Sequence, residues 1–284
     1  MKPAPDVAAA PGVFGRWTRD PVTLVSLVVV GLVLVVGIGA PFLAPYDPYA
    51  QNLPDRRAAP GGRFLLGADE FGRDVLSRVM YGAGLALRTA VVATGIGLVS
   101  GTALGLLAGF FGGWLDDVIM RAMDVLLAFP YLLLAIAVVS ALGPGEITTQ
   151  IAIGFWALPS FARVVRSSTL SLRERDFVEA ARAQGAGALR IIWCHVLPHA
   201  MWPLVAFATL FVARAIVLES ALSFLGLWAQ PPAASWGGMV ASGRDYLRIA
   251  PHIALVPGVA IALTVLAFNL LGDGLRDIFQ GGHA

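Results

Sequence analysis

The stretch TAVVATGIGLVSGTALGLLAGFFGGWL, residues 89–115, contains no charged side chain. Residues 125–145 and 253–272 form two further stretches without a charge. A helix needs about 20 mainly apolar residues to cross the roughly 30 Å hydrocarbon core of a bilayer. All three stretches reach that length, so they predict transmembrane helices and indicate an integral membrane protein.

The composition of the whole chain supports the same class. Of the 284 residues, 57% are hydrophobic and only 13% are charged, whereas a soluble domain carries about 25% charged residues. The single cysteine excludes an intramolecular disulfide and a multi-cysteine metal cluster. The single lysine, Lys2, excludes a phosphate-binding loop of the GxxxxGK[ST] type, so the chain is not itself a P-loop ATPase.

Hydropathy along the chain predicts an all-α, polytopic fold with six transmembrane helices. A polar segment, residues 1–20, precedes the first span, and an amphipathic segment, 75–87, precedes the second. We expect the spans at about residues 22–44, 89–111, 122–142, 147–164, 201–225 and 253–272. No internal repeat is visible, which disfavours a secondary transporter built from inverted repeats.

The positions of the basic residues predict the orientation. If the N-terminus is cytoplasmic, more basic residues lie in the cytoplasmic segments than in the external ones, and the positive-inside rule favours that arrangement by a modest margin. The charged segment 165–200 then faces the cytoplasm.

That charged segment predicts a pair of short helices. Ser171 with Glu174 is typical of a capping box that opens a helix at about residue 172. Gly185 suits the C′ position after that helix. A second helix is expected over 188–196, ending before Pro198. Periodicity alone is equally compatible with an amphipathic helix pair lying on the membrane surface.

The order of residues within the segment resembles the EAA loop of ATP-binding-cassette importer permeases. Glu179-Ala180-Ala181 is followed after three residues by Gly185, and after nine more by the run 195–198, HVLP. In that family the loop contacts the ATPase subunits. The resemblance therefore implies a coupling role for Glu179, Ala180, Ala181, Gly185, Leu197 and Pro198.

Three further segments are similar to the C-type permease of the dipeptide, oligopeptide and nickel group: LGADEFGRD at 66–74, ESALSFLG at 219–226 and NLLGDGLRD at 269–277. The resemblance covers about residues 20–278. It implies a cytoplasmic N-terminal tail (1–20), a transmembrane permease domain (21–278) and a C-terminal tail (279–284). Within the permease domain it implies external loops at 45–88 and 226–252 and a cytoplasmic coupling loop at 165–200.

The resemblance also implies a function and a set of partners. The chain would be a permease of an ATP-driven, binding-protein-dependent importer, with di- or oligopeptides as cargo. Its partners would be a homologous B-type permease, two ATPase subunits, an external substrate-binding protein and membrane lipid, but no nucleic acid. It would be a multi-pass protein of a bacterial or archaeal cytoplasmic (inner) membrane, with both termini in the cytoplasm. ATP and magnesium would be bound by the partners, and this chain would hold no cofactor.

Other functions remain open at this stage. The same class of importer carries nickel, glutathione or opines. An ion-coupled transporter or channel is a second alternative, and ATP depletion would distinguish it. A membrane-embedded enzyme is a third, but no catalytic arrangement is visible. His195 and His199 do not form an HExxH zinc site, because no glutamate follows His195.

Four glycines in the second span, Gly97, Gly101, Gly105 and Gly109, recur at a spacing of four. In lipid, such a spacing lets two helix backbones approach closely, within the subunit or with a partner permease. The alternative is an ordinary glycine-rich membrane helix.

Two ionisable residues, Arg214 and Glu219, fall inside the fifth span. Charges at membrane depth are costly and usually face a cavity or a partner. Five positions separate them, about 140° around the helix axis, so we expect each to face a different neighbour. They are candidates for the lining of a translocation path or for contacts between helices.

Overall fold

The fold is a bundle of helices, seen in a computed structural model that describes residues 20–228 and 232–280. The predicted tails fall largely outside this range. The helices are α2 (Pro21–Leu43), α3 (Val75–Phe111), α4 (Gly113–Ala128), α5 (Tyr131–Leu142), α6 (Glu146–Leu172), α7 (Asp176–Ala183), α8 (Ala188–Ile191), α9 (Leu197–Phe224), α10 (Trp236–Gly243) and α11 (His252–Gln280). Within the described residues no strand forms, only two isolated bridges, which confirms the all-α class.

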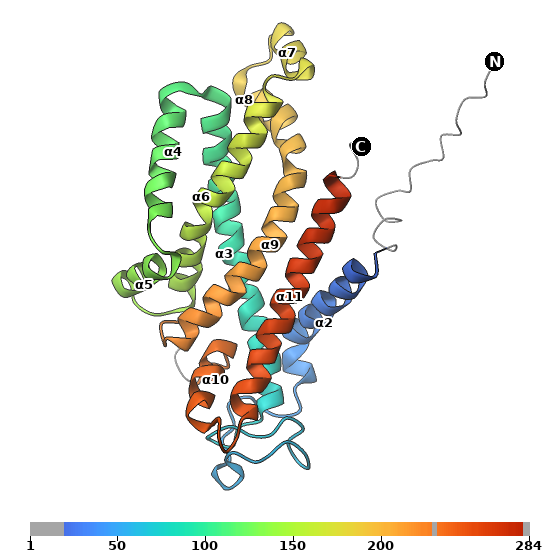
Figure 1. The fold of residues 1–284 in the computed structure, drawn as a ribbon, viewed down its shortest axis with the longest axis vertical. Helices are drawn as coiled ribbons and strands as arrows, with labels where there is room; N and C mark the ends of the chain where they lie inside the picture. Colours follow the sequence, from blue (N-terminus) through green and yellow to red (C-terminus); the bar gives the residue numbers. More distant parts are fainter. Residues whose placement is uncertain (1–19, 229–231, 281–284) are drawn as a thin grey trace, which may run out of the picture.

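The long helices run along one axis, with small elements at either end (Figure 1). One end carries α7 and α8. The other carries α10 and the segment that joins α2 to α3, and we call this end the end-cap (residues 44–74 and 232–251). The helices α4 and α5 lie at one side of the bundle, and α2 at the opposite side.

The number of clear membrane spans is smaller than predicted. Four stretches are long and apolar enough to cross a bilayer: Pro21–Leu43, Val75–Phe111, Pro203–Phe224 and His252–Asp277. The pair α4 and α5 makes a fifth if it counts as one span. The helix α6 is long enough but carries Glu146, Arg163 and Arg166. By length and composition the described residues therefore do not exactly confirm the count of six spans.

The third predicted span is broken, because α4 and α5 meet at an angle of 93°. Phe129 and Pro130, between them, have extended backbone angles. A proline disfavours the helical conformation of the residue before it, so α4 ends at Ala128. The apolar run 125–145 does not show this bend, because hydropathy does not depend on backbone direction.

The amphipathic segment and the second span form one continuous helix, α3, rather than two pieces. Its first turn is capped by Asp74, whose carboxylate accepts a hydrogen bond from the Ser77 N–H at 2.8 Å. Arg88, at the expected junction, does not interrupt the helix. Its side chain reaches the start of α6, and the Arg88 Nε lies 2.6 Å from Glu146 Oε1.

The four spaced glycines of α3 lie against α6 of the same chain. A Cβ added at Gly101 would come within 2.7 Å of the Leu158 carbonyl oxygen. A Cβ added at Gly105 would lie 2.5 Å from the Ala162 carbonyl oxygen. Gly97 and Gly109 meet α6 in the same way, at Ala157 and Thr169. The two backbones therefore touch along four turns, and no larger residue fits between them.

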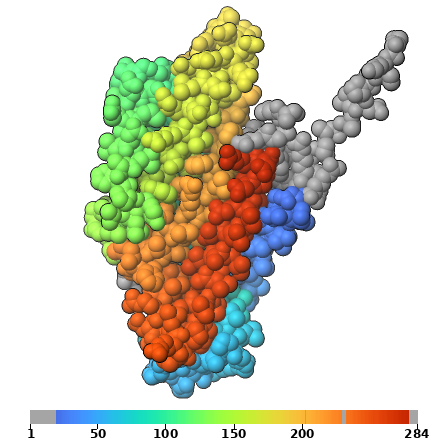
Figure 2. Space-filling view, viewed as in Figure 1, coloured from blue at the N-terminus to red at the C-terminus, as the bar shows by residue number. Residues whose placement is uncertain are grey.

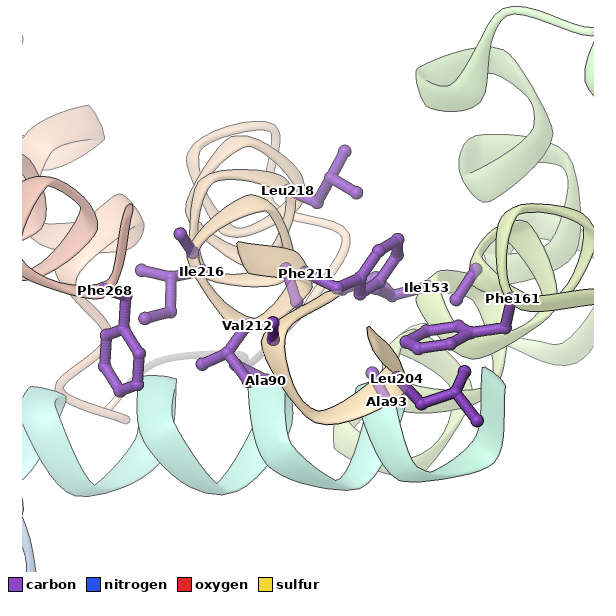
Figure 3. Packing of buried hydrophobic residues seen from close by; sticks show 14 of the residues in the cluster. Ala90, Ala93, Ile153, Phe161, Leu204, Phe211, Val212, Ile216, Leu218 and Phe268 are labelled. Atoms are coloured by element: carbon purple, nitrogen blue, oxygen red, sulfur yellow. The ribbon is translucent and has the colours of Figure 1, made fainter. Parts of the chain in front are cut away.

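The hydrophobic core lies where α9 crosses this helix pair (Figure 3). Phe161 of α6 packs against two aromatic rings of α9, with centroids 5.0 Å from Phe207 and 5.4 Å from Phe211. Ala90 and Ala93 of α3 close the core from the other side, with both side chains fully buried.

The end-cap is held by buried arginines. Arg78 of α3 donates a hydrogen bond to the Pro48 carbonyl oxygen at 2.9 Å, and two longer ones, at 3.4 Å, to the carbonyl oxygens of Pro232 and Ala233. Its Nε lies 3.4 Å from Asp69 Oδ2. One guanidinium thus joins both segments of the end-cap to the start of α3.

We expect Gly101→Leu to destabilise the folded chain by about 1–3 kcal/mol or more, because the added side chain meets a backbone oxygen that has no room to move. Gly95 is the matched control, since a Cβ there meets nothing within 4 Å on the same helix. Thermal unfolding in detergent should show a lower midpoint for Gly101→Leu than for Gly95→Leu. Equal midpoints would mean that α3 and α6 do not pack this closely.

Candidate functional site

The loop between α6 and α9, residues 173–196, projects from the end of the molecule opposite the end-cap (Figure 1). The predicted capping box at Ser171 does not form. The helix α6 continues through Ser171 to Leu172, and α7 begins only at Asp176. The reason is that α6 keeps packing against α3 to its end, where Thr169 is buried and Arg173 donates to the Gly109 carbonyl oxygen at 3.0 Å. The predicted helix 172–184 is therefore shorter at its start.

The end of α7 has the geometry expected for Gly185. This glycine has φ +83°, in the left-handed region. Its N–H donates to the Arg182 carbonyl oxygen at 2.9 Å, and the Ala186 N–H donates to that of Ala181 at 3.0 Å. These two bonds form a Schellman motif, which turns the chain sharply back.

The second short helix does not stop before Pro198, and that prediction is wrong. The segment α8 passes through one turn of π-helix, η2 (Ile192–Val196), directly into α9. The Leu197 N–H bonds to the Ile192 carbonyl, one residue further back than in an α-helix. Such a wider turn accommodates the proline ring and its missing N–H near the start of α9.

The two alanines of the family motif face different environments. Ala181 is buried, with 7% of its surface exposed, and so is Val178. Glu179 and Ala180 are exposed. The buried face of α7 lies on this chain itself, and its outer face presents Glu179 and Ala180.

Two ring contacts attach α7 to the rest of the chain. The Phe177 ring stacks on His199 of α9, with centroids 4.8 Å apart. The Arg182 guanidinium lies over the ring of Phe110, at the end of α3, 5.6 Å from its centroid. The loop therefore contacts α3 and α9 as well as following α6.

Sequence reasoning missed two exposed apolar side chains on the same loop. Leu189 is 66% exposed and Trp193 is 63% exposed. They are four residues apart, as on one face of a helix, and this spacing was the signal available in the sequence. Leu197 is partly buried and Pro198 is exposed.

The structure separates Arg214 from Glu219. Glu219 is fully buried, and its Oε2 accepts a hydrogen bond from Ser220 Oγ at 3.2 Å. Its Oε1 has no hydrogen-bond partner among the described residues. Arg214 is exposed and forms no ion pair within the described part of the chain.

Arg214 lines a cavity of about 450 Å³ between α5, α6, α9 and α11. Aromatic rings form part of its wall, where Tyr131 and Trp156 have centroids 5.5 Å apart. Asn269 adds an amide from α11, and the remaining lining is Ala213, Val217, Leu218 and Val265.

The end-cap contains the other cluster of charges. Asp69 Oδ2 lies 2.6 Å from Arg73 Nε, and Glu70 Oε1 lies 3.3 Å from Arg73 Nη2. Burial raises the pKa of Glu70, and the nearby carboxylate of Asp69 acts in the same direction. Arg73 and Arg78 partly oppose this shift.

No group of three or more potential metal ligands occurs among residues 20–228 and 232–280. The Nδ1 atom of His199 lies 2.6 Å from the His195 carbonyl oxygen, as part of the local packing.

A polytopic helical chain with a helix–turn–helix loop at one end and a cavity lined by an arginine between its helices has the form of a membrane permease domain. The comparison with known families gives a more specific result. The chain belongs to the family described as binding-protein-dependent transport system inner membrane component, whose model matches residues 101–282. A second model, the N-terminal transmembrane domain of oligopeptide transport permease C, matches residues 12–60.

Similar curated proteins cover most of the chain. The glutathione transport system permease protein GsiD of Pectobacterium atrosepticum is 43% identical over 92% of this chain and 87% of its own length. The dipeptide permease DppC of Alkalihalophilus pseudofirmus is 43% identical over 93% and 87%. The di/tripeptide permease DppC of Pseudomonas aeruginosa is 48% identical over 87% and 83%.

A solved structure shares the fold. A chain of the MetNI methionine ABC transporter, in an inward-facing conformation, matches with a TM-score of 0.56 and 22% identity. The match covers 72% of this chain and 96% of that chain. The predicted family and fold class are thus confirmed, and the chain is a multi-pass membrane component of a binding-protein-dependent transport system.

We expect Gly185→Val to weaken the Schellman turn, because a side chain in the left-handed region costs about 1 kcal/mol or more. Hydrogen exchange at the amides of residues 185 and 186 should become about fivefold faster. Gly187→Val is the control, since Gly187 has φ −71° and open space around it. Equal exchange in the two variants would contradict this account of the turn.

Proposed function

We propose that this chain is one of two permease subunits that form the passage of an ATP-driven importer of di- or oligopeptides. The observation that carries the proposal is the 48% identity, over 87% of the chain, to a di/tripeptide permease. The GsiD relatives are named as glutathione permeases, and glutathione is itself a tripeptide, so both groups of relatives point to small peptides. Glutathione is the second candidate cargo, and competition between labelled dialanine and glutathione distinguishes the two.

The partners in this proposal are a homologous permease, two ATPase subunits and an external binding protein. ATP and magnesium bind to the ATPase subunits, and no residue of this chain takes part in hydrolysis. The protein lies in the cytoplasmic (inner) membrane, with the α6–α9 loop and both termini on the cytoplasmic side and the end-cap outside. The positive-inside bias supports this orientation.

The loop geometry suggests how the ATPase subunits would act on the spans. The outer face of α7, with Glu179 and Ala180, is free for a partner. Only three residues, 173–175, connect α7 to α6, and α8 continues into α9 without a break. The Phe177–His199 stack joins α7 directly to the start of α9. A displacement of α7 is therefore transmitted to α6 and α9 together.

We expect Ala180→Arg to abolish ATP-driven uptake while leaving the chain folded, because the added bulk projects into the ATPase contact. Ala181→Arg differs by one position but forces a charge beneath α7, so it should unfold the loop itself. The assay is uptake of labelled dialanine into liposomes that hold the complete importer, with and without ATP. Retention of the ATPase subunits and thermal stability are measured on the same samples.

Two outcomes of that assay would contradict the proposal. Full uptake by Ala180→Arg would remove the outer face of α7 from the ATPase contact. Wild-type uptake that persists without ATP but stops when the proton gradient collapses would instead favour an ion-coupled transporter.

The orientation has its own test, in a background of Cys194→Ser, which removes the single cysteine of the chain. Arg182→Cys and Arg56→Cys each place one thiol on an exposed position at opposite ends of the molecule. A membrane-impermeant maleimide should label position 56 in intact cells and position 182 only in inverted vesicles. Labelling of position 182 in intact cells would show that the chain has the opposite orientation.

A further inference from the structure

The guanidinium of Arg214 occupies an unusual place for a charge. About 15 Å of helix separate Arg214 from Phe224, and about 26 Å separate it from Leu197, at a rise of about 1.5 Å per residue. It therefore lies well inside the span Pro203–Phe224, yet its side chain is exposed at the surface of this chain. A charged group at this depth is not stable against lipid, so it faces a polar cavity or a partner.

The cavity beside Arg214 is larger than a salt-bridge partner requires. Its volume of about 450 Å³ lies within the range of about 300–1,000 Å³ that is usual for small-molecule sites. A single carboxylate side chain from a neighbouring subunit would fill only a small part of it. A second cavity, of about 290 Å³ near Leu98 and Phe268, has no charged residue in its lining. Two others, of about 350 and 200 Å³, take their charged residues from the end-cap and the start of α3 rather than from the middle of a span.

The lining matches one end of a peptide. A guanidinium binds a carboxylate through two parallel hydrogen bonds. The Asn269 amide both donates and accepts hydrogen bonds, as a peptide group requires. Tyr131 and Trp156 offer aromatic faces, which accept side chains of different shape without demanding a particular one.

We propose that the cavity lined by Arg214, Asn269, Tyr131 and Trp156 is a transient binding site for the C-terminal carboxylate of the transported peptide. This inference rests on the proposed function, because it takes a small peptide as cargo. Arg214 supplies the charge and Asn269 contacts the adjoining peptide group. The aromatic pair borders the variable side chain. Glu219, which is fully buried and not part of the cavity lining, takes no part in binding.

The test uses the complete importer, purified with its partner subunits and reconstituted in liposomes, with labelled dialanine as the probe. Arg214→Gln removes the charge and keeps much of the shape, whereas Arg214→Lys keeps the charge. Arg121→Gln is the control, because Arg121 is an exposed arginine of α4 that lies outside the cavity. Uptake, ATP hydrolysis and retention of all subunits are measured for each variant.

We expect Arg214→Gln to reduce dialanine uptake by about tenfold or more, as the loss of one charge-assisted contact would. Arg214→Lys should recover much of the uptake, and Arg121→Gln should behave as wild type. All subunits should stay together in every variant, and ATP hydrolysis should continue in Arg214→Gln. This combination is not expected from a residue that only holds helices in place.

Three results would overturn the inference. Wild-type uptake by Arg214→Gln would show that no carboxylate depends on this charge. Loss of the second permease from Arg214→Gln would show that Arg214 holds a partner instead. If the wild-type importer carries no dialanine or other small peptide, the proposed cargo fails and the inference falls with it, whereas the first two results leave that cargo intact.

Discussion

The close contact between the backbones of α3 and α6 is the constraint on which the other helices depend. Between helices in lipid, burial of apolar side chains supplies little driving force, so close van der Waals packing has to supply it. Glycines at positions 97, 101, 105 and 109 allow that packing over four turns. With the pair fixed, the alanines of α3 and Phe161 of α6 form the surface on which α9 lies (Figure 3). In the space-filling view α9 lies between α6 and α11 along much of the bundle (Figure 2).

The same contact determines how the α6–α9 loop is attached. Because α6 packs on α3 up to its last turn, Arg173 reaches the Gly109 carbonyl oxygen, and Arg182 of α7 reaches the Phe110 ring. The loop thus rests on the ends of both helices rather than hanging from one. On its other side, α8 and η2 run into α9 without a flexible joint. An attachment to three helices is consistent with the transmission of force that we propose for this loop.

The sequence predicted the elements whose signal is local and missed those decided by packing. Apolar runs place α2, α9 and α11, because the need for about 20 apolar residues does not depend on neighbours. The left-handed φ of Gly185 followed from the chemistry of helix ends. The capping signal at Ser171 was outweighed by the contact of α6 with α3. Two prolines did not have the predicted effect. Pro130 breaks a helix that was predicted to be continuous, and Pro198 does not end the helix that was predicted to stop before it. Nor does the sequence show that Ala180 faces outward and Ala181 inward, since that depends on where α7 lies.

Exposure has a different meaning for the different spans. The helix α2 is only 17% buried over its apolar window, yet its exposed side chains need no explanation, because lipid is as apolar as they are. The most buried window, at 50%, belongs to α9, and this is the helix that exposes Arg214. A charge is tolerated at that depth only beside water, substrate or a polar partner. The exposed apolar surface therefore does not locate the passage, and Arg214 marks the face of α9 on which we propose that substrate binds. The same helix buries Glu219 completely, so its two ionisable groups distinguish a face of α9 that packs within the subunit from a face that this chain leaves uncovered.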